Sequence, residues 1–387
     1  MKNTCRIQAD VLIIGGGVIG CSIAYHLACR KAKVAVLEDG DLAAGSSSAC
    51  DGLVFLQSKK PGVHLDLALA SRERFLYLQD ELPLPIEFSA CGGLVVVEDQ
   101  AQMQAMQSFV DRQVQGGLEV SLLDCKQARE LEPELSPDIA GASWSTLDGQ
   151  VNPIALTQSM ALGAKERGGE ILTGTEVTAF VWDKRGVRGV HTNRGRFEAR
   201  VVVLAAGVWT ARLGSMLGMH IPIIPRKGQL AVTQPTLPLL RHPMLSATYI
   251  AAKFDPELAG SGAQGVSMEQ TAHDTLLLGS TREFAGFDRS TVSQSIIGIA
   301  RRCAAIVPAL RDLRIIRSFA GLRPYTPDGV PLLGSAPGVS NVYIAAGHEG
   351  DGIALAPITG ELMAQLICDG GTDLPLDAFR TDRFGTE

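Results

Sequence analysis

Short apolar runs that end in glycine alternate with segments of helical spacing at the start of the chain. Residues 9–17 (ADVLIIGGG) form such a run, which predicts a buried parallel strand followed by a tight turn. Residues 18–31 carry apolar side chains at helical spacing, and residues 32–39 (AKVAVLED) form a second apolar run. Together the three segments predict a strand–helix–strand unit.

The rest of the chain mixes helical and strand-like patterns. Helices are predicted over residues 71–82, 101–117, 155–171 and 290–310, and a strand is predicted over 91–100. Alternating runs separated by glycine turns predict a β-meander over 175–210 and further strands over 229–234, 247–253, 264–270 and 274–283. A strand, a loop and a helix are predicted over 341–367.

Strand–helix patterns therefore lie at both ends of the chain, with antiparallel material between them. This order predicts an α/β nucleotide-binding domain of Rossmann type, built from discontinuous segments, with an inserted α+β domain that carries an antiparallel sheet. A chain of 387 residues is long enough for both. The nucleotide-binding domain is predicted over 1–85, 145–225 and 320–387, and the substrate-binding domain over 86–144 and 226–319.

Charge and cysteine usage exclude several classes of protein. The net charge of −6 and the lack of a long Lys/Arg cluster argue against binding of nucleic acid. None of the eight cysteines forms a CxxC pair, so no zinc, iron–sulfur or other metal site is expected, and free thiols fit a reducing compartment. Residues 11–29 are apolar, but three consecutive glycines argue against a transmembrane helix. We expect a cytoplasmic protein, with peripheral membrane attachment through a partner left open.

The turn after the first strand has the spacing of a dinucleotide-binding motif. Gly15, Gly17 and Gly20 form G-x-G-x-x-G, in which the glycines allow a tight turn, close approach of a pyrophosphate, and close contact between helix and strand. The pyrophosphate would lie at the N-terminus of the helix that begins near Val18. Glu38, after the second strand, is placed to accept hydrogen bonds from an adenosine ribose and disfavours the 2′-phosphate of NADP. The motif itself does not distinguish NAD from FAD.

Several motifs, in order along the chain, resemble the D-amino-acid oxidase and glycine oxidase superfamily of FAD enzymes, which includes sarcosine oxidases. They are DVLIIGGGVIGCSIAYHLA, GSSSACDG, WSTLDGQVNP, VVLAAGVWT, GLRPYTPDGVPLLG and NVYIAAGHEGDGIALAPITGELMAQLI. The resemblance runs from about residue 10 to about residue 367. A second glycine-rich helix start at GHEGDGI also favours FAD, since its N–H groups could stabilise negative charge on a reduced flavin.

The resemblance implies the positions of the site residues. Non-covalent FAD would be held by Gly15, Gly17, Val18, Ile19, Gly20, Glu38, Gly45, Ser46, Ser47, Ser48, Val177, Ala206, Gly207, Trp209, Gly321, Arg323, Gly347, His348, Glu349, Gly350, Asp351, Gly352 and Ile353. The substrate would be met by Arg323, through its carboxylate, by Tyr249 and by Glu269, with Gln270 as a further candidate. Arg323, Tyr249 and His348 are the expected catalytic residues, although no side chain is required to act as a base.

One segment departs from the glycine oxidase pattern. Those relatives carry a basic residue within the G-H-x-x-x-G-I loop, where this chain has Glu349, Gly350 and Asp351. A second cationic clamp is therefore expected to be missing. We also expect an acidic group to face the site, which would suit a substrate with an additional positive charge.

Residues 265–288 (GVSMEQTAHDTLLLGSTREFAGFD) resemble β subunits of heteromeric amine and imino-acid dehydrogenases, such as D-hydroxyproline dehydrogenase and opine oxidase. That resemblance implies oxidation of an amino or imino acid by hydride transfer to flavin, with electrons leaving to partner subunits that hold iron–sulfur or flavin centres. Two alternatives remain open. One is a self-sufficient oxidase that acts on glycine or D-amino acids with oxygen, and the other is a flavin-bearing assembly subunit without its own turnover.

Overall fold

The computed structural model describes residues 7–184, 186–254 and 265–385. The predicted N-terminal unit is present as β1 (Ile7–Ile14), α1 (Val18–Cys29) and β2 (Val34–Leu37), with β1 and β2 parallel. Side chains alternate across β1: Val11 and Ile13 pack with α1 and the C-terminal helix α10 (Gly352–Asp369), whereas Leu12 and Ile14 pack on the opposite face. Both faces of this strand are therefore buried, as its continuous apolar sequence requires.

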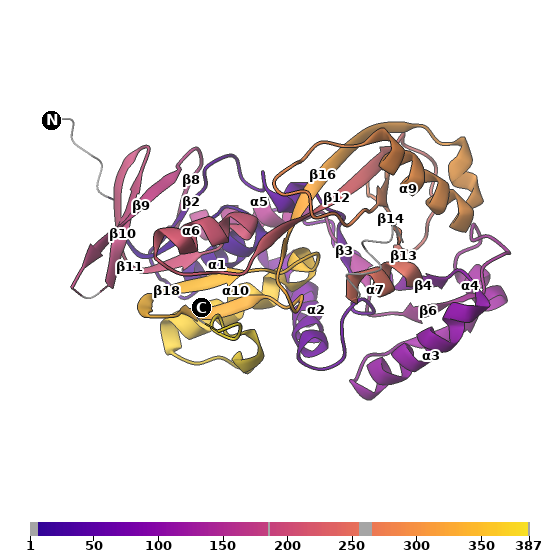
Figure 1. Cartoon of the computed structure of the whole chain (residues 1–387), viewed down its shortest axis with the longest axis horizontal. Coiled ribbons are helices and arrows are strands. Elements are labelled where there is room, and N and C mark those ends of the chain that lie inside the picture. The colour runs from indigo at the N-terminus through magenta and orange to yellow at the C-terminus, as the bar shows by residue number, and fades with distance from the viewer. Residues whose placement is uncertain (1–6, 185, 255–264, 386–387) are drawn as a thin grey trace.

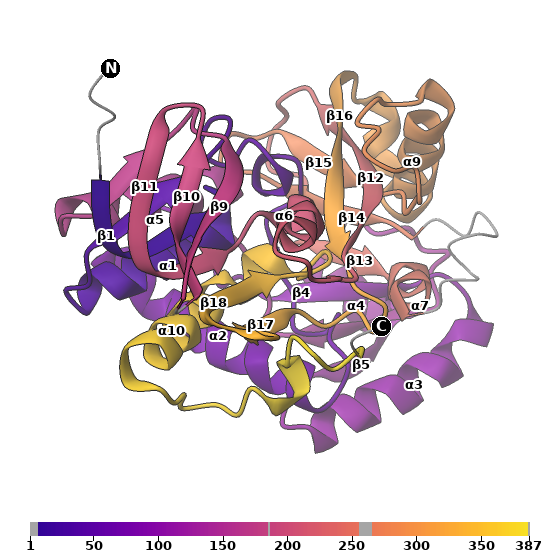
Figure 2. The same ribbon diagram turned by 60° about the vertical axis from the view of Figure 1, so that its left-hand side comes forward.

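β1 lies at the centre of an eight-stranded sheet. The strand order is β17 (Leu332–Ala336), β18 (Val339–Ala346), β11 (Gly195–Leu204), β1, β2 and β8 (Glu170–Leu172), and the predicted meander adds β9 (Val177–Asp183) and β10 (Gly186–Thr192) beside β11. Strands β18, β11, β1, β2 and β8 are parallel. Helices α1, α10, α2 (Val63–Glu81) and α5 (Pro153–Glu166) pack against one another beside this sheet (Figure 2).

A second eight-stranded sheet forms the other half of the molecule (Figure 1). Its order is β16 (Ile315–Tyr325), β12 (Ile224–Thr233), β15 (Leu276–Gly279), β14 (Ser267–Gln270), β13 (Met244–Ser246), β4 (Gly93–Val97), β6 (Gly141–Ser145) and β5 (Ser121–Asp124). Every pairing in it is antiparallel except that of β13 with β4. The fold is therefore the expected α/β nucleotide-binding unit together with an antiparallel sheet, and we propose the domain division given above.

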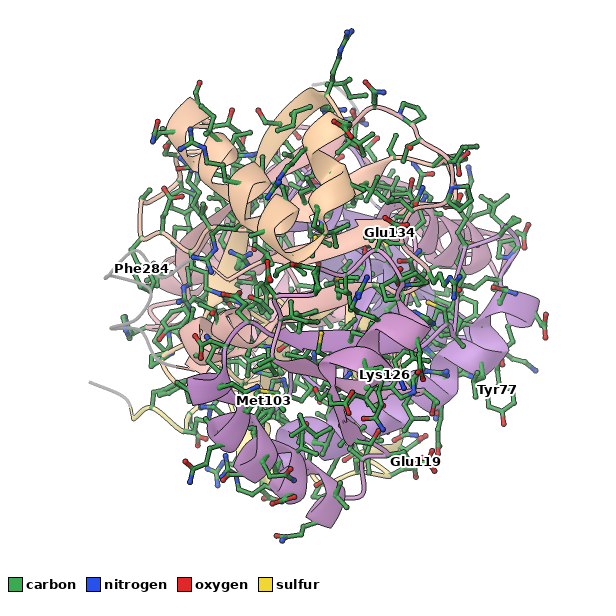
Figure 3. The ribbon with its side chains drawn as sticks, turned by 90° about the vertical axis from the view of Figure 1, so that its right-hand side faces the viewer. Tyr77, Met103, Glu119, Lys126, Glu134 and Phe284 are labelled. Carbon is green, nitrogen blue, oxygen red and sulfur yellow. The ribbon has the colours of Figure 1, made fainter. Side chains whose placement is uncertain are left out.

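The described part of the chain contains further strands and α-helices. They are β3 (Leu53–Val54), β7 (Gly149–Gln150), α3 (Gln100–Gln115), α4 (Cys125–Leu131), α6 (Thr210–Met216), α7 (Ala247–Phe254) and α9 (Ser293–Ile306). Helix α9 packs against β12 and β15, and α3 and α4 lie beside β5 and β6. Figure 3 views this end of the molecule, where Lys126 on α4 and Glu134 after it are exposed.

One predicted strand is wrong: residues 247–253 form most of helix α7. A short apolar run does not separate strand from helix by itself, and the alanines of this segment favour the helix. Tyr249 and Ile250 are buried in a cluster with Phe55 and Val95 of β4, so burial explains the apolar sequence without a strand. The predicted strand over 264–270 begins at Ser267, and Gln264 lies outside the described residues.

Asp148, in the WSTLDGQVNP motif, has a structural part in the fold. It is fully buried, and its carboxylate accepts hydrogen bonds from the backbone N–H of Leu56 (2.6 Å) and from Nε2 of Gln57 (2.7 Å). Burial raises the pKa of Asp148 to about 6. The side chain ties the turn between β6 and β7 to the segment that follows β3.

Replacement of Asp148 by alanine should therefore lower the free energy of unfolding by about 2–4 kcal/mol, because buried donors lose their acceptor. Denaturant-induced unfolding of the FAD-loaded protein measures this change. Asp138→Ala, at an exposed position, is the matched control and should change that free energy by less than about 0.5 kcal/mol. Equal effects of the two substitutions would contradict this role of Asp148.

Candidate functional site

The turn between β1 and α1 requires glycine at two of its three motif positions. Gly15 has a φ of +119°, and a Cβ there would lie 2.4 Å from the carbonyl oxygen of Ala205. A Cβ on Gly20 would lie 1.9 Å from the carbonyl oxygen of Gly15. Gly17 precedes α1 and provides no capping side chain, while the N–H of Val18 donates to Ser47 Oγ at 3.0 Å. The start of α1 therefore offers backbone N–H groups at the end of the parallel strands.

Glu38 follows β2 directly and is fixed by the backbone of two loops. Its Oε2 accepts from the N–H of Gly16 at 2.6 Å, and its Oε1 accepts from the N–H of Gly40 at 2.9 Å. The side chain lines the same cavity as Gly15 and Gly17. A carboxylate oxygen has more than one lone pair, so each can still accept from a ribose hydroxyl.

A cavity of about 400 Å³ extends from this turn to the second sheet. Most of the predicted site residues line it: Gly15, Gly17, Val18, Ile19, Glu38, Gly45, Ser46, Ser47, Val177, Ala206, Gly207, Trp209, Tyr249, Gly321, Arg323, Gly347, His348, Glu349, Gly350, Gly352 and Ile353. They come from both ends of the chain and from its middle. Helix α10 begins at the cavity with Gly352. As in α1, the residue before the helix makes no capping hydrogen bond through its side chain.

Five predicted site residues are not among those that line the cavity. Gly20 packs beneath the turn, and Ser48 is exposed at the end of a short 3-10 helix. Asp351 is buried beneath the α10 loop, where its carboxylate accepts from Lys59 Nζ at 2.7 Å and from Lys253 Nζ at 2.8 Å. Glu269 is buried behind Gly52, and Gln270 hydrogen-bonds the backbone at residues 239 and 240.

Arg323, on β16, lies at the end of the cavity formed by the second sheet. Its Nη1 donates to the carbonyl oxygen of Thr281 at 3.0 Å, and its Nη2 donates to Ser280 Oγ at 2.8 Å. A guanidinium has five N–H donors, so others remain for a ligand. The neighbouring Gly228 leaves room for it, because a Cβ there would lie 2.3 Å from Nη1. This arrangement can present a fixed cation to a carboxylate.

Tyr249, from α7, lies at the same end. Burial raises the pKa of its hydroxyl. The guanidinium carbon of Arg282 lies 4.5 Å from the centre of its ring, which is a cation–π contact. Arg282 was not identified from the sequence, although it lies within residues 265–288, because it follows β15 and reaches the site only through the pairing of the second sheet.

The absence of a second cationic clamp on the substrate stays a prediction, because two further arginines lie at this end but neither is among the residues that line the cavity. Arg282 Nη1 lies 2.9 Å from Glu349 Oε1, and Arg226 Nη1 lies 3.6 Å from the same oxygen. Although burial opposes ionisation, Arg282, Arg323 and the other nearby cations lower the pKa of Glu349. Glu349 is therefore an ion-paired anion, and two arginines from the second sheet supply the positive charge that the loop itself lacks.

Aromatic rings enclose the outer side of these arginines. The guanidinium carbon of Arg226 lies 5.4 Å from the centre of the Phe284 ring and 5.2 Å from that of Tyr325. Phe284 is 55% exposed and lies at the periphery of the molecule in Figure 3. Arg226 itself is almost completely buried, so the rings shield the ion pair from solvent.

His348 lies in the loop before α10 but is unsuited to proton transfer at neutral pH. It is buried, and its Nε2 lies 3.1 Å from Thr359 Oγ1 of α10. Burial lowers its pKa to about 3, so the imidazole is neutral. Its contact with α10 indicates that it fixes the loop.

Comparison with known proteins identifies the family. The pattern of the FAD-dependent oxidoreductase family, DAO, matches residues 10–366. The chain belongs to this family. It is 32% identical to a glycine oxidase of Geobacillus kaustophilus, with 97% of each chain covered, and 31% identical to the hydrogen cyanide synthase subunit HcnC of Pseudomonas aeruginosa, with 98% of this chain and 97% of that one covered.

Solved structures agree with the assignment of this chain to the FAD-dependent oxidoreductase family. The crystal structure of the G. kaustophilus glycine oxidase matches with a TM-score of 0.88 at 30% identity, covering 97% of this chain and 99% of the other. That of an L-proline dehydrogenase from P. horikoshii matches with a TM-score of 0.89 at 28% identity, covering 98% of each. The protein is thus an enzyme whose cofactor is FAD.

The cavity of this oxidoreductase fits FAD. It joins the Glu38 end, with its ribose acceptors, to the Arg323 end, and the starts of both α1 and α10 border it. The absence of side chains at Gly17, Gly45 and Gly207 leaves backbone accessible where a dinucleotide would lie, and a Cβ on Gly207 would meet no atom within 4 Å. Within the described residues, no cluster of His, Cys, Asp and Glu could hold a metal ion, and no helix is long and apolar enough to cross a membrane.

Replacement of Glu38 by alanine should weaken FAD binding by at least about tenfold. The substitution removes the acceptor of two loop N–H groups and the expected acceptor of the ribose, and a charge-assisted hydrogen bond is worth about 1.5–3 kcal/mol. Titration of the apoprotein with FAD, followed by flavin fluorescence, gives the dissociation constant. Asp41→Ala, at an exposed position nearby, is the control and should leave it unchanged.

Proposed function

We propose that this enzyme oxidises the C–N bond of an amino or imino acid and passes the electrons to a partner protein. The observation that carries the proposal is the fixed guanidinium of Arg323 in a cavity lined by both glycine-rich helix starts. A planar guanidinium recognises a carboxylate through two parallel hydrogen bonds. The names of the relatives, glycine oxidase and L-proline dehydrogenase, agree with an α-amino or α-imino acid substrate.

The residues of this chain would hold the two reactants in one geometry. Gly15, Gly17 and Glu38 would bind the adenosine and pyrophosphate part of FAD, and the N-terminus of α10 would stabilise negative charge on its ring system. The flavin, when bound, accepts the hydride of the substrate. Arg323 would orient the substrate carboxylate, and Tyr249 would form the opposite wall, which together place the bond to be oxidised.

Two features favour a partner as electron acceptor. Residues 265–288 resemble β subunits of heteromeric dehydrogenases, and the relative HcnC is itself named as a subunit of a synthase. No centre for onward electron transfer other than FAD is indicated by the side chains of the described residues. Hydroxyproline, opines and other secondary amines are the substrates that we propose first, and we propose a cytoplasmic location.

Anaerobic reduction of the bound flavin tests the substrate class. Glycine, sarcosine, D-amino acids, L- and D-proline, hydroxyproline and opines should be mixed separately with the FAD-loaded enzyme, and we expect one of the secondary amines to bleach the flavin fastest. Little hydrogen peroxide should form when oxygen is admitted. Rapid peroxide formation with glycine or D-amino acids would instead favour a self-sufficient oxidase. Bound FAD that no amine reduces would favour an assembly subunit.

Arg323→Ala should raise KM for the reactive substrate by about 30- to 1,000-fold, because a buried carboxylate without its cation costs about 2–4 kcal/mol. Steady-state kinetics with an artificial acceptor measures this effect. Arg323→Lys keeps the charge but loses the two-donor geometry and should fall between the alanine variant and the wild type. Unchanged KM in both variants would contradict the carboxylate-binding role.

A further inference from the structure

Asp51, in the GSSSACDG motif, is an acidic group of the substrate end of the cavity that was not among the predicted site residues. It lines the cavity beside Cys50 and Leu53. Ser267 Oγ of β14 donates a hydrogen bond to its Oδ2 at 3.0 Å. The segment 45–52 therefore brings a carboxylate to the same end of the cavity as Arg323 and Tyr249, which also line it.

Glu269 lies directly behind this carboxylate. It is 4% exposed, and both of its oxygens accept from the N–H of Gly52, at 2.9 and 3.0 Å. Burial, together with the charge of Asp51, raises the pKa of Glu269 to about 8. Burial also raises the pKa of Asp51, although Arg323, Ser267 and Arg282 oppose this. Two adjoining buried carboxyl groups disfavour a second negative charge, and Glu269, with its pKa of about 8, is the one that holds a proton at neutral pH.

The remaining groups around Asp51 do not compete for the proton. Arg323 and Arg282 are cations, Ser267 donates, and burial raises the pKa of the Tyr249 hydroxyl and of the Cys50 thiol, so both stay protonated. Glu349 is ion-paired with Arg282. The substrate end of the cavity therefore presents two different groups, the guanidinium of Arg323 and the carboxyl group of Asp51.

We propose that Asp51, backed by Glu269, binds the nitrogen of the amino or imino acid and takes a proton from it before oxidation. This proposal rests on the function proposed above. An amino acid arrives as a zwitterion, whose carboxylate suits Arg323 and whose ammonium suits Asp51. Asp51 is then a catalytic residue and Glu269 a positioning residue.

The proton step follows from the chemistry of the C–N bond. A protonated nitrogen has no lone pair from which the second C–N bond can form when the hydride leaves the neighbouring carbon. Breaking one N–H bond of the ammonium and forming an O–H bond on Asp51 restores that lone pair without any change of oxidation state. The proton on Glu269 removes a second negative charge from behind Asp51. The pKa of Asp51 is therefore raised less than it would be beside a charged carboxylate.

Two matched ligands separate nitrogen recognition from carboxylate recognition. 2-Aminoisobutyrate has a carboxylate and an ammonium but no α-hydrogen, so it cannot be oxidised, and isobutyrate lacks the nitrogen. Calorimetry with the FAD-loaded enzyme should show that the wild type binds 2-aminoisobutyrate more tightly than isobutyrate. Asp51→Asn should reduce this preference by at least about tenfold. Glu269→Gln, which keeps Asp51, should retain the preference within about threefold.

The pH dependence of flavin reduction gives a second readout. With an oxidisable amino acid, the rate of the Asp51→Asn variant should keep rising with pH until the amine of the substrate loses its own proton. The wild-type rate should level off at lower pH. If Asp51 has only a structural role, Asp51→Asn would weaken the binding of both ligands equally and leave the pH profile of flavin reduction unchanged. Either result would overturn the inference. Failure of the wild type to bind either ligand would count against Arg323 and the proposed function itself.

Discussion

The site depends on two buried carboxylates in one turn, Glu349 and Asp351. Glu349 is held by Arg282 and Arg226 of the second sheet, and Asp351 is held by Lys59 and Lys253. Lys253 belongs to α7 and the turn leads into α10, so these ion pairs connect the substrate wall to the helix start that borders the cofactor cavity. Removing one partner of such a pair costs about 3–5 kcal/mol, because the other charge is left buried. The geometry of both parts of the site is thereby fixed together.

The buried charges also explain why the loop can depart from the sequence pattern of its relatives. An acid at position 349 would repel a substrate carboxylate if it stood alone. Here it is neutralised by two guanidiniums that approach from strands far away in the sequence. The cavity keeps a positive charge at Arg323, and the charge of Glu349, which also lines the cavity, is balanced by Arg282 and Arg226. The charges of neighbouring residues in the sequence therefore do not predict the electrostatic field at a buried site. Ion pairs between residues that are far apart in the sequence determine that field.

The parts of the molecule that the sequence predicted are the ones that local chemistry determines. The turn at Gly15 and Gly20 needs glycine for steric reasons, and β1, α1 and β2 follow from apolar spacing within forty residues. Arg282 and Arg226 were missed because pairing within the second sheet brings them to Glu349, and no local pattern encodes that pairing. Asp51 was missed although it lies in the GSSSACDG motif, because only the folded chain shows that it lines the cavity. Helix α7 was missed because burial, not strand geometry, sets its apolar pattern. Glu269 was identified as a substrate residue but lies behind Gly52, one layer from the cavity.

Arg282 and Arg323 have different surroundings and therefore different roles in the site. Its guanidinium lies over Tyr249 and against Glu349, and it is not among the residues that line the cavity, whereas Arg323 is. Arg282 therefore fixes the Tyr249 ring and balances the charge of Glu349, and in the proposed function Arg323 alone would bind the substrate carboxylate. An arginine that is already paired cannot move to follow a ligand, so the separation between Arg323 and Asp51 is set by the protein. Under the proposals above, a substrate would be selected by whether its carboxylate and nitrogen match that separation, which is a stricter criterion than charge.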